Sequence, residues 1–242
     1  MTNTQNPADD GIVTASNVIV PAYLEKYYWW AYARPWAIKF WERDWLIDLI
    51  LWFHYKRLRG EALAAFGDAL DGKTLQMSCA YGALTPMLHK KITASGGSLD
   101  VVDVVIHQLR NLKRKIPNAD NLRLFNMDAT AMSLLPDQTY DRVLMFFLPH
   151  ELPKEAKEKA FNEAFRVAKP GGTILVVEFS KPKWWHPLRY IYLPFLRFLE
   201  PFAPQIWKND DIGAWVPKPF VDKLVSRKKI FGDYYQILMF KA

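Results

Sequence analysis

Apolar residues along this chain recur in short blocks that alternate between the spacing of a β-strand and that of an α-helix. Five apolar runs of strand length follow one another through the middle of the chain, at 74–78, 98–102, 122–126, 142–147 and 173–179. Helical patterns precede or separate most of them, at 61–70, 85–93, 105–115 and 154–168. This alternation predicts an α/β fold, a doubly wound and mostly parallel sheet with helices on both faces.

The end of the chain departs from this alternation. The helix at 154–168 should stop at the following KPGG, because proline and glycine end helices. Two further strand-like runs, 223–231 and 234–241, flank Gly232 and Asp233, which predicts a hairpin. With this hairpin at one edge, we expect a seven-stranded sheet.

The region before residue 61 has a different pattern. Residues 21–60 carry Trp41, Trp45, Leu49 and Trp52 at helical spacing, which predicts one or two amphipathic helices that form a cap ahead of the core. This cap either packs on the domain as a lid or contacts lipid, and the two roles are compatible, since interfacial helices place Trp beside Lys and Arg. We expect residues 1–20 to be disordered.

Residues 181–215 interrupt the α/β domain, which we place at 61–242. This insert is rich in Pro, aromatic residues and Arg, and it leaves the last core strand at its carboxyl end. Together with the cap it could form an apolar channel over the active site, or simply a second core. The arginines among these aromatics would suit acidic lipid headgroups; they are Arg34, Arg43, Arg189 and Arg197.

Composition narrows the classes of partner. The chain has 242 residues, a net charge of +7 and 15% aromatic residues, including ten Trp. The positive charge favours anionic partners, and nucleic acid is disfavoured because no nucleic-acid-binding motif is present. One cysteine, Cys79, excludes an internal disulfide and suits a reducing compartment. The longest apolar run, 45–53, falls far short of the roughly 20 residues that span a bilayer, so we expect a cytoplasmic protein that is soluble or lies on a membrane.

Candidate cofactor residues lie after the first three strands. The segment TLQMSCAYGALT, residues 74–85, stands where a nucleotide-binding glycine loop is expected, but it keeps only Gly82. Asp103 follows the second strand and is placed to accept hydrogen bonds from ribose hydroxyls, and Asp128 follows the third and is placed to meet an adenine amino group. The loop alone could be a plain turn, but with both acids the spacing predicts a site for S-adenosylmethionine (SAM). The expected cofactor-binding residues are Gln76, Ser78, Ala80, Gly82, Asp103, Val104, Asp128, Ala129 and Phe146.

The segment RVAKPGGTILVVEFSKP, with NMDA, YDRV and VVDV in their places, resembles the ubiquinone/menaquinone C-methyltransferase family over about residues 70–182. That resemblance implies a class I SAM methyltransferase fold. The family carries an acid and three glycines in the loop after its first strand. Here the position of the acid is Gln76, and two of the glycine positions are Ser78 and Ala80.

A second resemblance covers nearly the whole chain. The segments WWAYARPWAIKFWERDWLIDLILW, CAYG, FFLPHE and HPLRYIYLPFLRFLEPFA are similar to the rhodoquinone biosynthesis protein family (RquA). This resemblance implies that a methoxy group of ubiquinone is exchanged for an amino group, with SAM as the amino donor and manganese assisting. Because ubiquinone carries an isoprenoid tail, it also implies a peripheral location on the cytoplasmic face of the inner membrane, on anionic lipid.

Three residues are candidates for the reacting side. Manganese prefers oxygen and imidazole ligands, so His150 and Glu151 form the best local metal pair, and Tyr81 would line the same side. A metal on the quinone carbonyl oxygen would stabilise the developing negative charge. The alternative for His150 and Glu151 is helix capping or surface solvation.

Gln76 bears on the choice of reaction. Without a carboxylate beside it, the SAM amine is more easily deprotonated and could attack carbon. The alternative is that Gln76 is an ordinary strand residue. An ordinary quinone methyltransferase and a non-catalytic quinone- or SAM-binding component remain the other functional hypotheses, and the sequence leaves the oligomeric state open.

Overall fold

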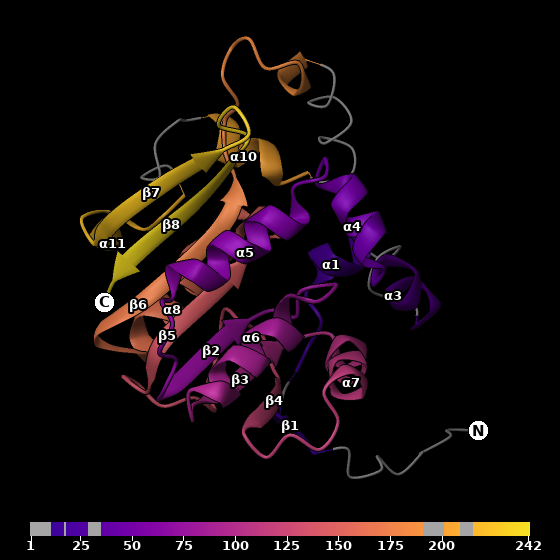
Figure 1. The fold of residues 1–242 in the computed structure, drawn as a ribbon, viewed down its shortest axis with the longest axis vertical. Helices are drawn as coiled ribbons and strands as arrows, with labels where there is room; N and C mark the ends of the chain where they lie inside the picture. The colour runs from indigo at the N-terminus through magenta and orange to yellow at the C-terminus, as the bar shows by residue number, and fades with distance from the viewer. Residues whose placement is uncertain (1–10, 17, 29–34, 191–200, 209–214) are drawn as a thin grey trace.

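The computed structural model describes residues 11–16, 18–28, 35–190, 201–208 and 215–242 (Figure 1). One eight-stranded sheet has the order β1-β4-β3-β2-β5-β6-β8-β7. The strands are β1 Ile12–Thr14, β2 Lys73–Met77, β3 Ser98–Asp103, β4 Leu122–Asn126, β5 Tyr140–Phe146, β6 Ala168–Phe179, β7 Leu224–Ile230 and β8 Tyr235–Lys241. The helices are α1 Ala22–Tyr27, α3 Pro35–Trp41, α4 Asp44–Ile50, α5 Tyr55–Ala65, α6 Leu84–Ala94, α7 Ile106–Lys115, the 3₁₀ helix η1 Pro149–Glu151, α8 Lys154–Val167, α10 Ala203–Lys208 and α11 Lys218–Val221.

The predicted α/β fold is confirmed. Strands β1 to β6 pair in parallel, and β8 runs antiparallel to both β6 and β7, as the predicted hairpin requires. Helices α5, α6 and α7 lie on one face of the sheet and α8 on the other (Figure 1). The central strands are apolar and fully buried, as at Leu75, Val101 and Val176, so the sheet forms a rigid base for the loops at its carboxyl edge.

The sheet has one strand more than expected. Residues 12–14 pair with residues 124–126 of β4, although we expected residues 1–20 to be disordered. Without β1, the strand β4 would be at the edge of the sheet and would leave backbone N–H and C=O groups unpaired. A short extended segment can pair with these groups even when its own sequence has no apolar pattern. Residues 1–10 and 17 lie outside the described residues.

One predicted helix is displaced. The helix expected at 61–70 is Tyr55–Ala65; the backbone N–H of Tyr55 donates to the Asp48 carboxylate at 3.0 Å, and Leu58 and Ala62 bury its inner face. The helix predicted to stop before KPGG ends at Val167, within one residue of the expected end, and the KPGG residues belong to the start of β6. There the pairing register between β5 and β6 shifts, and Gly171 has a φ of 78°.

The cap consists of α1, α3 and α4, which lie beyond the carboxyl ends of the central strands (Figure 1). None of the helices described here is long and apolar enough to cross a membrane. Several residues of the predicted lipid-contacting segments lie outside the described residues, namely Trp29, Trp30, Arg34 and Arg197.

Candidate functional site

A pocket opens at the carboxyl ends of β2, β3 and β4, where the switch in strand order lies. The loops after these strands supply six lining residues, Ser78, Cys79, Val104, Val105, Asp128 and Ala129, and the end of β3 supplies Val102 and Asp103. The segment after β5 supplies Leu148, Glu151 and Leu152, helix α7 supplies Gln108, and helix α1 of the cap supplies Tyr23 and Leu24. The structure therefore brings together the expected cofactor residues Ser78, Asp103, Val104, Asp128 and Ala129.

Asp103 is the best-positioned acceptor of the pocket. Its Oδ2 accepts a hydrogen bond from the Cys79 amide at 2.7 Å and its Oδ1 accepts one from the Val105 amide at 2.7 Å. Burial raises the pKa of Asp103 to about 6, although these hydrogen bonds oppose the shift. The carboxylate is thus mainly ionised at neutral pH and keeps lone pairs for further donors, as the hydroxyls of a ribose would be.

Ser78 shows that the loop keeps the backbone path of a glycine loop. Its φ is 73°, in the left-handed region that glycine adopts freely and that strains other residues by about 1 kcal/mol. Its amide donates to the Val102 carbonyl at 2.8 Å, and its hydroxyl lies 3.5 Å from Asp103 Oδ2. Ser78 therefore adopts the backbone conformation that a glycine would take at this position.

Gln76 supports this loop from beneath. It is fully buried, and its side-chain nitrogen donates to the Ser78 carbonyl and to the Thr85 hydroxyl, both at 3.0 Å. Among the described residues, its Oε1 has no hydrogen-bond partner. Gln76 is not among the residues that line the pocket, so its contact with the cofactor stays a prediction.

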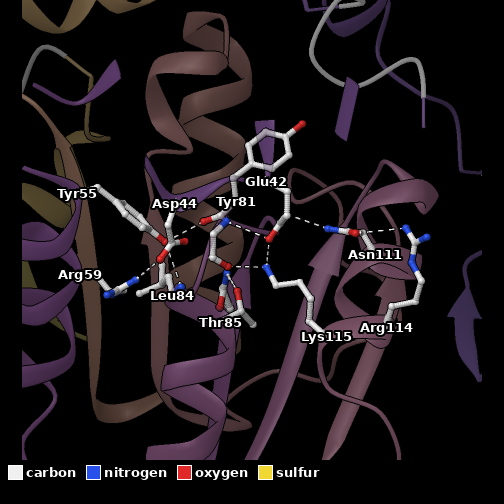
Figure 2. Close-up of polar contacts among 12 residues, drawn as sticks. Glu42, Asp44, Tyr55, Arg59, Tyr81, Leu84, Thr85, Asn111, Arg114 and Lys115 are labelled. Carbon is white, nitrogen blue, oxygen red and sulfur yellow. Dashed lines mark hydrogen bonds and ion pairs between the residues drawn. The ribbon is translucent and has the colours of Figure 1, made fainter. Parts of the chain in front are cut away.

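Gly82 contacts the cap instead of the pocket. Its amide donates to Glu42 Oε1 at 3.2 Å, and the Lys115 ammonium bonds both the Glu42 carboxylate and the Gly82 carbonyl (Figure 2). A Cβ at Gly82 would lie 2.6 Å from both Asp44 Oδ1 and the Tyr55 hydroxyl. The one glycine kept in the loop is thus required by the close approach of α4 and α5.

Tyr55 of α5 holds the loop after β2 through two hydrogen bonds. Its hydroxyl donates to the Tyr81 carbonyl at 2.9 Å and accepts from the Leu84 amide at 3.1 Å (Figure 2). Burial, with the nearby negative charge of Asp44, raises its pKa to about 12, so the hydroxyl stays protonated and can donate. Cap, loop and first helix of the domain form one hydrogen-bonded unit.

Of the residues expected on the reacting side, Glu151 lines the pocket and Tyr81 does not. The expected cofactor residues Ala80 and Phe146 also lie outside the lining. Tyr81 lies beside Gln108, and burial together with the charge of Glu151 raises the pKa of its hydroxyl. Phe146 is buried behind the pocket, with its ring 6.4 Å from that of Tyr55.

His150 contacts Glu178. Its Nδ1 lies 3.1 Å from Glu178 Oε1, and its amide donates to Glu178 Oε2 at 2.9 Å, within a buried region. In the described residues, no three His, Cys, Asp or Glu side chains group closely enough to hold a metal ion. The role of His150 and Glu151 as a metal pair therefore stays a prediction from the sequence.

Several lining residues escaped the sequence analysis. Cys79 and Leu148 belong to segments that the sequence analysis singled out, and Leu152 directly follows one of them. Gln108 lies five residues after Asp103, so position alone could have suggested these four residues. Tyr23 and Leu24 gave no such signal, because they reach the pocket from a helix 55 residues earlier than Ser78.

Known proteins resemble the central part of the chain. Residues 74–172 match the methyltransferase domain family. The chain is 34% identical over 122 residues to the ubiquinone/menaquinone biosynthesis C-methyltransferase UbiE of Cronobacter sakazakii, covering 50% of this chain and 47% of that protein. It is 30% identical over 160 residues to a demethylmenaquinone methyltransferase of Streptomyces avermitilis, covering 62% of this chain and 66% of that protein. The matched region thus spans about half of the first relative's length.

Solved structures share the fold at low identity. A SAM-dependent methyltransferase from Aquifex aeolicus is 19% identical with a TM-score of 0.55, over 86% of this chain and 97% of that one. The mitomycin 7-O-methyltransferase MmcR is 14% identical with a TM-score of 0.60, over 86% of this chain and 58% of that one. With the strand order and the pocket at the strand ends, these similarities show that the chain has the class I SAM methyltransferase fold, within which residues 74–172 match the methyltransferase domain family.

Proposed function

We propose that this protein is a SAM-dependent transferase that acts on the ring of a membrane quinone. The observation that carries the proposal is the pocket in which Asp103 and Asp128 stand at the ends of neighbouring strands, in a chain similar to quinone C-methyltransferases. Asp103 would accept the ribose hydroxyls, and Asp128 would meet the adenine. The loop from Ser78 and the residues Val104 and Ala129 would enclose the rest of the cofactor.

The other side of the pocket suits a quinone ring. Leu24, Leu148 and Leu152 give it apolar walls, and Glu151 adds one carboxylate. Burial and the charges of Asp128 and Glu151 raise the pKa of Tyr23, so its hydroxyl stays neutral and can donate a hydrogen bond. SAM supplies an electrophilic methyl group when bound, and these side chains would orient the ring toward it and exclude water.

The decisive experiment combines the purified chain, SAM and a quinone, with products identified by mass spectrometry. Methyl transfer would yield S-adenosylhomocysteine and a ring product heavier by one methylene when a demethylated quinone is offered. Asp103→Ala should abolish SAM binding, while Asp137→Ala, an exposed acid far from the pocket, should not. No turnover of either ubiquinone or a demethylated quinone, with SAM bound, would favour a non-catalytic binding component instead.

Amination of ubiquinone is the second candidate, and Gln76 is the observation that favours it. In that reaction the amine nitrogen of SAM bonds to the ring carbon, and the methoxy group leaves with a proton as methanol. The Cα–H of the bound SAM chain and the N–H would then pass two protons and two electrons to the quinone, which becomes a hydroquinone. Water would hydrolyse the resulting imine to the free ring amine and a 2-oxo acid. A neutral Gln76 beneath the loop leaves no acid there to hold that amine as ammonium.

Nitrogen labelling separates the two candidates. With ¹⁵N in the SAM amine, a labelled ring amine supports amination, and an unlabelled product with S-adenosylhomocysteine supports methyl transfer. If amination occurs, Gln76→Asp should slow it while SAM still binds; an unchanged rate would remove the role given to Gln76.

Manganese remains a prediction from the resemblance to RquA. Among the described residues, no three His, Cys, Asp or Glu side chains gather around one point. Adding Mn²⁺ back to chelator-treated protein tests the prediction. Glu151→Gln should then weaken the response if Glu151 is a ligand.

A further inference from the structure

Large apolar side chains are exposed on two segments that are far apart in the sequence. The end of the cap exposes Trp45 by 59% and Phe53 by 70%, and the start of the insert exposes Trp184 by 74%. Four neighbours in the same segments are also exposed, namely Leu49, Ile50, Trp185 and Tyr190. Exposed aromatic residues in such number are unusual unless a partner covers them.

Contacts between rings join the two segments. His54, next to Phe53, stacks on Phe231 with ring centroids 4.0 Å apart. Phe231 in turn meets His186, next to Trp185, at 4.6 Å. The cap end and the insert start therefore belong to one surface, which we call the docking face: Trp45, Leu49, Ile50, Phe53, Trp184, Trp185 and Tyr190.

Charge is distributed unevenly around the docking face. The acids at residues 42–48 are engaged by the protein itself: Glu42 bonds Lys115 and Gly82, Asp44 bonds Arg59, and Asp48 accepts from the Tyr55 amide. Exposed cations lie on α3 and α5, between α3 and α4, and at the start of the insert: Lys39, Arg43, Lys56, Arg57 and Lys183. The rim therefore presents positive charge around exposed aromatic residues.

We propose that the docking face binds the surface of an anionic lipid bilayer. Trp and Phe would enter the headgroup boundary, and the rim cations would meet acidic headgroups, each contributing on the order of 1 kcal/mol. A second copy of the chain fits less well, since a twofold contact through this face would bring like-charged rims together.

The inference rests on the proposed function in one respect, because a quinone with an isoprenoid tail must be taken from a bilayer. The cap contributes residues to both the docking face and the pocket. Helix α1 places Tyr23 in the pocket, and the Tyr23 ring lies 6.0 Å from that of Phe202 in the insert. Docking would thus position the lipid beside the elements that cover the pocket.

Vesicle co-sedimentation of the full chain tests the proposal without SAM or quinone. Phosphatidylcholine vesicles containing phosphatidylglycerol should bind the protein, and added salt or omission of phosphatidylglycerol should weaken binding. The combined Trp45→Ser, Phe53→Ser and Trp184→Ser variant should bind at least about tenfold more weakly. Val225→Ser, an equally exposed apolar position on β7 (56%), should bind as the unchanged protein does.

Three outcomes would overturn the proposal. These are no binding to phosphatidylglycerol vesicles, unchanged binding by the triple variant, or self-association through this face that the same substitutions abolish. SAM affinity of each variant shows that its fold is intact, and the single Trp184→Ser variant, in a loop, serves if the triple variant does not fold. Turnover of a short-chain soluble quinone should be unaffected, so its absence would count against the proposed function and not against docking.

Discussion

Glu42 in the cap accepts a hydrogen bond from the Gly82 amide at 3.2 Å, across 40 positions of sequence. Through Lys115, which bonds Glu42 and the Gly82 carbonyl, the contact also reaches α7. Asn111 of α7 donates to the other Glu42 oxygen at 2.8 Å. The loop that follows β2 is thus held on one side by the sheet and on the other by the cap, so the cofactor pocket depends on residues outside residues 74–172.

Gly82→Ala should destabilise the protein strongly. The added Cβ meets Asp44 and Tyr55 at 2.6 Å, and the φ of 75° strains alanine as well. We expect the free energy of unfolding to fall by about 2–4 kcal/mol, measured by urea denaturation. Gly67→Ala is the matched control, because Gly67 has a φ of 80° and nothing within 4 Å of its Cβ, so it should show the conformational strain alone. Equal losses in the two variants would contradict the steric role of the cap.

The Glu42–Lys115 pair should show strong coupling in a double-mutant cycle. Both side chains are largely buried, at 20% and 22% exposed, and each makes further hydrogen bonds. Glu42→Gln and Lys115→Met should give a coupling energy of about 1–3 kcal/mol by denaturation. The exposed pair Glu61 and Lys228, at 28% and 56%, should give less than about 1 kcal/mol. If the coupling energy of Glu42 and Lys115 is as small as that of Glu61 and Lys228, this ion pair does not hold the cap to the domain.

SAM affinity should weaken as the pH falls through about 6. The pKa of Asp103 in the folded protein is about 6, above its ordinary 3.8, so the carboxyl becomes protonated there and loses acceptor capacity. We expect the dissociation constant to rise about three- to fourfold between about pH 7.5 and 5.5, measured by calorimetry. Asp103→Asn should bind weakly at every pH and lose this dependence; a dependence that persists in Asp103→Asn would assign it to another group.

The raised pKa of Asp103 makes the stability of the fold depend on pH in the opposite direction to SAM affinity. Because the folded state holds the proton more tightly than the unfolded state, the contribution of Asp103 to the free energy of unfolding falls as the pH rises from about 4 to about 6. The charged carboxyl therefore lowers stability at neutral pH. Asp103→Asn, which removes this charge, should show a smaller decrease in the free energy of unfolding across that pH window than the unchanged protein.

Glu178 should be a structural residue under His150. It accepts from the His150 amide at 2.9 Å and from the Phe179 amide at 2.6 Å, and it is fully buried. Glu178→Ala would leave these donors buried without their acceptor, lowering the free energy of unfolding by about 2–4 kcal/mol. Glu178→Gln, which keeps one acceptor, should lose less, and the exposed Glu158→Ala should be nearly neutral. Chemical denaturation of the three variants distinguishes these outcomes, and a neutral Glu178→Ala would contradict the assignment.

The sequence by itself determined the order of strands and helices from β2 to β8 and the two acids at the strand ends. These follow from local periodicity, since an apolar run in an alternating chain forms a buried strand whatever its distant neighbours are. Asp103 and Asp128 could be placed for the same reason: parallel strands end at one edge of the sheet, so the residue after each strand faces the same ligand site.

Only the tertiary structure decided which residues meet across long stretches of chain. The cap helix brings Tyr23 into the pocket, Glu42 takes the Gly82 amide, and Glu178 takes His150. Neither spacing nor composition encodes such contacts, because each depends on how elements pack after the sheet has formed. For the same reason β1 was missed: its three residues pair only because β4 offers an open edge.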